Sequence, residues 1–79
     1  MKLTYDPRYN VAYIHLKEKT AEVETVHISE ELSIDLTPDG TIYGIELLNA
    51  NEQLMPTPNG KLVVVNEERG QTTEIALSQ

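Results

Sequence analysis

The chain has 79 residues, with thirteen acidic side chains, six basic ones and a formal net charge of −7. This length allows one domain with a thin core, and the absence of cysteine excludes disulfides and cysteine-based zinc sites. The acidic balance argues against binding to nucleic acid or to an anionic membrane surface, because both need a basic face. No apolar run reaches membrane-spanning length and no signal-peptide hydrophobic region is present, so a cytoplasmic location is expected.

Self-association is the next expectation from length and composition. A small domain without disulfides often gains its remaining stability from association with a second copy. We therefore expect a homo-oligomer, with a dimer as the first hypothesis. Solubility alone explains the negative charge, and a basic protein partner is the sharper alternative.

Two short strands are predicted at the start of the chain, over residues 2–6 and 11–16. The Asp-Pro step at position 6 disfavours helix and favours a turn between them. In the second strand the alternation places Val11, Tyr13 and His15 on one face. The other face carries alanine, isoleucine and leucine and is the predicted core face. A third strand over about residues 22–28 has an ambiguous register.

The central hairpin has the clearest pattern, with strands over residues 32–36 and 42–48 around the turn Thr37-Pro38-Asp39-Gly40. Proline presets φ inside the turn and glycine takes the position that needs positive φ. The second strand is apolar on both faces, which favours a central place in a sheet. Gly44 within it marks either a bulge or a close approach of the backbone.

A short helix is predicted at residues 51–55, followed by a second hairpin with strands over residues 61–65 and 72–77. The run over 61–65 is apolar on both faces. It is expected to be either central in the sheet or covered by a partner chain, because an exposed apolar edge would invite aggregation.

These elements predict a mainly β protein, all-β rather than α+β. We expect an antiparallel β-meander of two or three hairpins in a single sheet, with at most one short helix, in one small domain over residues 1–79.

Two surfaces are candidate interfaces. Tyrosine buries area while keeping a polar tip, so the face of Val11, Tyr13 and His15 is the first. The alternative for Tyr13 is a cross-strand pair with Tyr5 or Tyr43 inside the sheet. The second candidate surface is the apolar strand Leu62, Val63, Val64 and Val65.

Little in the sequence points to catalysis. Asp35 and Glu46 lie near each other across the central hairpin and could form an acid–base pair, or be two solvated carboxylates. His15 and His27 lack a metal-ligating spacing and are expected to be partly exposed strand residues. No glycine-rich phosphate loop or activated nucleophile is present. We therefore assign no catalytic, cofactor-binding or metal-binding residue.

Two blocks of the sequence resemble the small prokaryotic proteins of the domain of unknown function 2283 family. The first block is Tyr5, Asp6, Pro7 and then Tyr13, Ile14 and Leu16. The second and more specific block is Ile34, Asp35, Leu36, Asp39, Gly40, Gly44, Ile45, Glu46, Leu47, Leu48 and Ala50. The resemblance covers residues 1–52, so residues 53–79 form a C-terminal hairpin or extension.

The resemblance implies a compact β-meander and no known activity, cofactor or catalytic residue. Some similar proteins look like the partner half of two-gene modules, beside a compact toxin-like protein. The function predicted first is therefore a non-enzymatic, self-associating interaction protein, of which an antitoxin-like role is one version. The alternative is a small ligand-binding or hydrolytic module that uses Asp35, Glu46 and a histidine.

Overall fold

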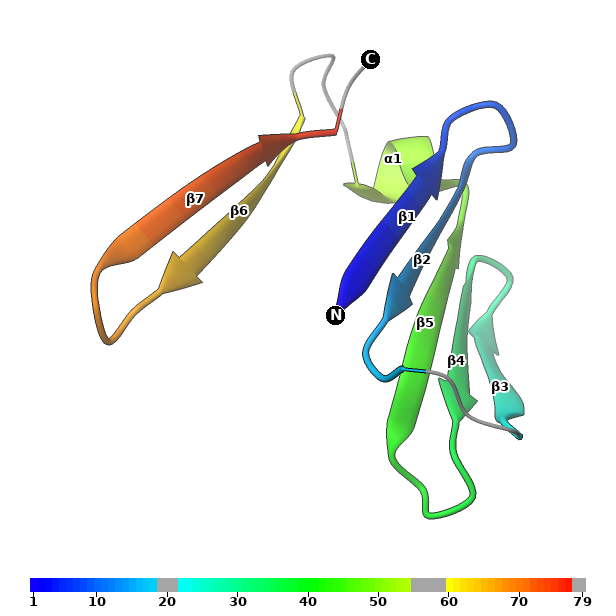
Figure 1. Ribbon diagram of the computed structural model, residues 1–79. Coiled ribbons are helices and arrows are strands. Elements are labelled where there is room, and N and C mark those ends of the chain that lie inside the picture. The colour runs from blue at the N-terminus through cyan, green and yellow to red at the C-terminus, as the bar shows by residue number, and fades with distance from the viewer. Residues whose placement is uncertain (19–21, 55–59, 78–79) are drawn as a thin grey trace.

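The computed structural model describes residues 1–18, 22–54 and 60–77 (Figure 1). The elements in chain order are β1 (Lys2–Asp6), β2 (Val11–His15), β3 (Glu24–Ser29), β4 (Leu32–Leu36), β5 (Ile42–Leu48), α1 (Ala50–Leu54), β6 (Lys61–Asn66) and β7 (Gln71–Ala76). The predicted mainly β fold with one short helix is confirmed. The predicted end of the helix, Met55, lies outside the described residues. No helix in the described part of the chain is long and apolar enough to cross a membrane.

Five strands form one antiparallel sheet in the order β1-β2-β5-β4-β3. The chain makes the hairpin β1–β2, passes to the far edge at β3, and returns through β4 to β5 beside β2. β5 is the central strand, as its two apolar faces predict. In the central hairpin Leu36 pairs with Ile42, and a register shift next to this pair leaves Tyr43 as an extra residue in β5.

The last two strands form a separate two-stranded sheet, β6-β7, which stands apart from the larger sheet in Figure 1. The predictions of a single sheet and of a central place for residues 61–65 were therefore wrong. β6 and β7 are adjacent in sequence and pair fully with each other, from the pair Lys61–Ala76 to the pair Asn66–Gln71. Alternation of side chains predicts strand formation, but it carries no information about which sheet a hairpin joins.

Cross-strand register assigns every side chain of the larger sheet to one of two faces, because directly paired residues share a face. The apolar face is defined by two rows of paired residues: Leu3–Ile14–Ile45–Ile34–Val26 and Tyr5–Ala12–Leu47–Leu32. The polar face is defined by the rows Thr4–Tyr13–Glu46–Ser33–His27 and Lys2–His15–Gly44–Asp35–Thr25.

The core is small and lies where α1 meets β2. Ala12 and Ala50 are the buried hydrophobic residues of the described chain, with exposed fractions of 1% and 0%. No large side chain in the described ranges is fully buried, and most of the apolar face is only half-buried. A sheet normally buries its apolar face against a second layer. In the part of the chain that the structure describes, α1 supplies such a layer at one end only.

Candidate functional site

A hydrogen-bonded chain of side chains crosses the polar face at Tyr13. From β2, the Tyr13 side chain passes over Gly44 of β5, and its hydroxyl donates to Asp35 Oδ2 on β4 at 2.5 Å. The other Asp35 oxygen accepts a 2.6 Å hydrogen bond from the Thr25 hydroxyl on β3. Four strands are thereby linked or crossed by three side chains. Burial, and then the hydrogen bond to Asp35, raise the pKa of the Tyr13 phenol well above its usual range.

Gly44 makes room for this crossing. A Cβ added at Gly44 would lie 2.5 Å from Cζ of Tyr13, closer than nonbonded carbon atoms approach. The close approach expected at this glycine is therefore real, but it comes from a side chain and not from another backbone. The bulge expected as the alternative also exists beside it, at Tyr43. The glycine at this place thus has a local physical reason in this chain.

The alternative pairing of Tyr13 with Tyr5 or Tyr43 was wrong. The cross-strand partners of Tyr13 are Thr4 and Glu46, while Tyr5 lies on the apolar face. The Tyr13 ring instead contacts His15, with ring centroids 4.4 Å apart. Strand alternation did place Tyr13 and His15 on one face correctly, and Val11 lies there with them. That this face is an interface stays a prediction.

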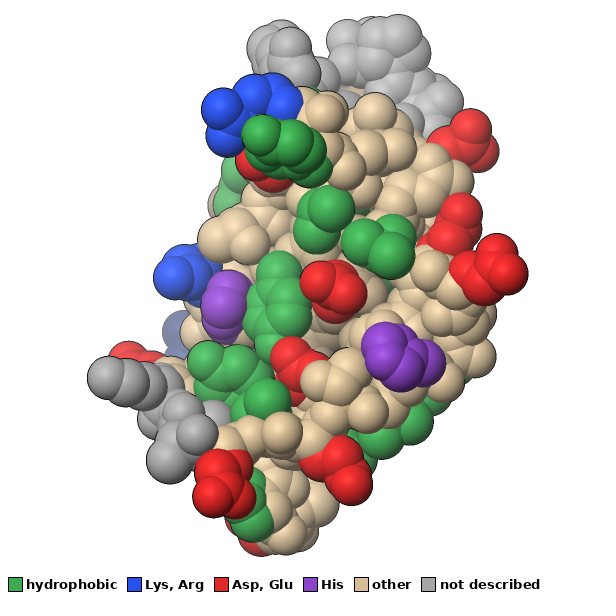
Figure 2. Space-filling view, turned by 90° about the vertical axis from the view of Figure 1, so that its right-hand side faces the viewer, with side chains coloured by type: hydrophobic (Ala, Val, Ile, Leu, Met, Phe, Trp, Pro, Cys, Tyr) green, Lys and Arg blue, Asp and Glu red, His purple; other side chains and the backbone are tan. Residues whose placement is uncertain are grey.

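Asp35 and Glu46 share the polar face as diagonal neighbours, since Asp35 pairs with Gly44 and Glu46 with Ser33. Figure 2 shows acidic side chains gathered between two histidines on this face. His27 Nδ1 is 2.8 Å from the Ser33 hydroxyl. His15 is on β2 and His27 on β3, three strand spacings apart, or roughly 14 Å. Within the described ranges, no three metal-ligating side chains lie close enough to hold an ion.

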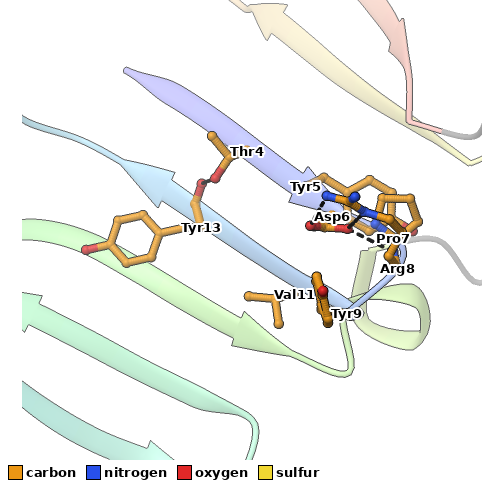
Figure 3. Close-up of a pocket in the computed structure, with 8 residues that line it drawn as sticks. All are labelled: Thr4, Tyr5, Asp6, Pro7, Arg8, Tyr9, Val11 and Tyr13. Carbon is orange, nitrogen blue, oxygen red and sulfur yellow. Dashed lines mark hydrogen bonds and ion pairs between the residues drawn. The ribbon is translucent and has the colours of Figure 1, made fainter.

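An open hollow of about 620 Å³ lies at the β1–β2 turn (Figure 3). Arg8 donates to both oxygens of Asp6, from Nε at 3.1 Å and from Nη2 at 3.0 Å, and this pairing lowers the pKa of Asp6. The guanidinium also lies 5.6 Å from the centre of the Tyr9 ring. Asp6 already neutralises the charge of Arg8. A ligand in the hollow would therefore meet the aromatic ring of Tyr9 rather than a free positive charge. It is lined by Thr4, Tyr5, Asp6, Pro7, Arg8, Tyr9, Val11 and Tyr13.

A cluster of amide side chains, which no sequence motif predicted, holds one end of the sheet. Asn10 and Asn49 have φ of 59° and 52°, a left-handed conformation that asparagine tolerates better than most residues. Asn10 Nδ2 donates to Asn49 Oδ1 at 3.1 Å, and Asn49 Nδ2 donates to Glu31 at 3.0 Å. Asn10 Oδ1 accepts from the backbone of Asn51 at 2.6 Å. We call this set, Asn10, Glu31, Asn49 and Asn51, the amide cluster. It joins the β1–β2 turn, the β3–β4 turn and α1.

The larger sheet is the part of the chain that matches a known family. A family model described as "Protein of unknown function (DUF2283)" matches residues 2–51, which include the five-stranded sheet and the start of α1. The hairpin β6–β7 lies outside the matched residues. No curated protein and no solved structure matches the chain. Since the match spans more than half of the residues, the chain belongs to this family of proteins of unknown function.

Proposed function

We propose that the protein is a non-enzymatic interaction module that first associates with a second copy of itself. The observation that carries the proposal is the uncovered apolar face. Its central row runs across all five strands from Leu3 to Val26 without a charged residue. None of its side chains is fully buried by the described residues, and Val26 at the edge is 37% exposed. A contiguous apolar surface of this kind is typical of a protein–protein interface.

The polar face supports a non-enzymatic role. A general base needs a free acceptor within hydrogen-bond reach of a substrate proton. Asp35 has both carboxylate oxygens engaged by Tyr13 and Thr25. Neither histidine forms an ion pair with a carboxylate among the residues the structure describes. The tightest contacts on this face therefore brace strands against one another.

A matched pair of variants on the two edge strands tests self-association. Val26→Glu places a charge on the apolar face, at β3, and Thr4→Glu places the same charge on the polar face, at β1. Sedimentation equilibrium should show a dimer for the wild type and for Thr4→Glu, and a monomer for Val26→Glu. Far-UV circular dichroism should show the same strand content in all three proteins. A wild type that stays monomeric at millimolar concentration would contradict the proposal, as would a dimeric Val26→Glu variant.

The acidic polar face is the surface on which we place a basic protein partner. Asp35 and Glu46 lie together on it, and the chain carries seven more acidic than basic residues. Charge complementarity of this kind steers association and selects partners. A compact basic toxin-like partner would make the role antitoxin-like.

Purification of the tagged protein at native level, with mass spectrometry of what accompanies it, tests this second contact. The wild type and the control Glu52→Lys, on α1, should retain a stoichiometric basic protein. Glu46→Lys should lose it while keeping the oligomeric state of the wild type. If none of the three preparations contains such a protein, the proposed basic partner is wrong, and solubility alone explains the negative charge.

A further inference from the structure

The hairpin β6–β7 has exposed apolar side chains that the described part of its own chain does not cover. Val63, Val64, Val65 and Ile75 are 47%, 50%, 53% and 50% exposed. No strand of the hairpin pairs with a strand of the larger sheet. A two-stranded hairpin by itself is only marginally stable in water, and three strands or a packing surface are normally needed. The hairpin therefore needs a surface on which to pack.

Register decides which side of the hairpin is suited to packing. Leu62 pairs with Ile75, and Val64 pairs with Thr73, so these four residues share one side, which carries no charge between them. We call this the uncharged side of the hairpin. The opposite side carries Lys61 and Glu74, which form an ion pair at 3.0 Å. Burying that pair would cost desolvation, so the uncharged side is the docking side.

The apolar face of the larger sheet has the matching character. Copies of a chain with a net charge of −7 repel one another, so they gain most by meeting on surfaces without charges. The central row of the apolar face is such a surface, whereas the polar face carries Asp35 and Glu46. The hairpin, on the left in Figure 1, lies on the side of the sheet away from the polar face, which Figure 2 shows from the right. Two copies that face each other with their apolar faces would thus each present a hairpin to the partner.

Contact area favours a reciprocal exchange over a one-way contact. Strands of six residues and a width of two strands give a plan area of about 200 Å², or about 400 Å² counted on both surfaces. One such contact is in the range of crystal packing. Two exchanged hairpins double it to about 800 Å², and the adjoining parts of the two sheets add to this toward the ~1,600 Å² of a standard interface.

We propose that the β6–β7 hairpin of one copy docks by its uncharged side on the apolar face of a second copy, in a reciprocal two-fold exchange. This inference rests on the proposed self-association and names the segment that makes the contact. It also gives a role to the hairpin, which lies beyond the family match. In the dimer, each hairpin covers the apolar face of the partner's five-stranded sheet.

Neighbouring valines on β6 provide the first test in the full-length chain. Val64→Glu alters the uncharged side, and Val63→Glu alters the opposite side at nearly equal exposure. Sedimentation should show at least a tenfold weaker dimer for Val64→Glu and less than a twofold change for Val63→Glu. A dimer that both variants leave unchanged would overturn the exchange and leave the proposed self-association intact. A monomeric wild type would overturn both.

Disulfide trapping then separates exchange from closure of the hairpin on its own sheet. The chain has no cysteine, so single cysteines report cleanly. A copy with Ile75→Cys is mixed with a copy that carries Ile14→Cys and a distinguishing tag, and the mixture is oxidised mildly. A covalent heterodimer is the expected product, with Thr4→Cys, on the polar face, as the control that gives none. If no heterodimer forms, and the double variant Ile14→Cys/Ile75→Cys forms an internal disulfide, the hairpin closes on its own chain and the inference is wrong.

Discussion

The five-stranded sheet and the C-terminal hairpin are both built of antiparallel strands, but the side-chain contacts that hold the strands in place differ between them. In the sheet, side chains far apart in the chain are joined, as in Tyr13 with Asp35 and Asn10 with Asn49. In the hairpin the polar contacts are internal, such as Lys61 with Glu74. The sheet is therefore held in shape by its own side chains although its apolar face is open. The hairpin has a complete ladder and little else.

The difference shows that pairing of strands and burial of their faces are separate problems. Antiparallel ladders form in both regions, but a ladder by itself contributes little net stability. Polar side chains on one face of the sheet supply connections that a second layer would otherwise provide. The following substitutions act on the polar side-chain contacts that hold the sheet in shape.

The largest effect is expected at Gly44. Gly44→Val should destabilise the sheet by about 1–3 kcal/mol, because the new side chain displaces Tyr13 from its path to Asp35. Urea unfolding measures the loss. In a Tyr13→Ala background the same change should be neutral or stabilising, since valine suits a central strand better than glycine. Equal losses in the two backgrounds would show that the Tyr13 contact is not the reason for glycine here.

Asn49→Ala should cost about 1–2 kcal/mol, through lost hydrogen bonds to Asn10 and Glu31 and through strain at φ of 52°. Asn49→Gly removes the same hydrogen bonds but accepts the positive φ, so its cost should be smaller. Thermal unfolding of both variants beside the wild type separates the two contributions. If glycine costs as much as alanine, backbone conformation is not what selects asparagine at this position.

Much of the fold could be predicted from the sequence because the signals are local. The Pro38-Asp39-Gly40 turn and the alternation around it predicted the central hairpin, in which Leu36 pairs with Ile42. Apolar residues on both faces of residues 42–48 correctly placed that strand in the centre. The separation of the hairpin could not be predicted, because strand alternation does not say where a hairpin docks.

The polar contacts were predicted less well because they depend on diagonal geometry. Tyr13 and Asp35 lie on strands whose order in the sheet the sequence does not reveal. A contact between them across Gly44 of the intervening strand therefore could not be predicted. Asn10 and Asn49 are 39 positions apart and have ordinary turn residues around them. The nearest signal was Gly44 within an apolar strand, which indicated either a bulge or a close approach of the backbone, but not an approach by a side chain.

Tyr13→Phe removes only the hydroxyl and should cost about 1 kcal/mol at neutral pH. The raised pKa of Tyr13 means that its contribution is fully present below the usual tyrosine value of about 10 and is lost as pH rises toward the folded-state value. Absorbance of tyrosinate should show one of the four tyrosines ionising late, and this late step should be absent in Tyr13→Phe. Tyr9→Phe, at a residue that is 75% exposed, is the control and should leave the late step in place.

The smallest effect is expected where the two regions are most alike, at their turns. Asp39 accepts hydrogen bonds from the Thr37 hydroxyl and from the backbone and hydroxyl of Thr41, and these lower its pKa to about 2. Because the folded-state pKa lies below the ordinary 3.8, the contribution of Asp39 is present above about pH 4 and is lost as pH falls through about 2. The stability difference between wild type and Asp39→Asn should therefore shrink between pH 5 and pH 2. A stability difference that stays constant over this range would mean that the sheet's turn is no better braced than the hairpin's.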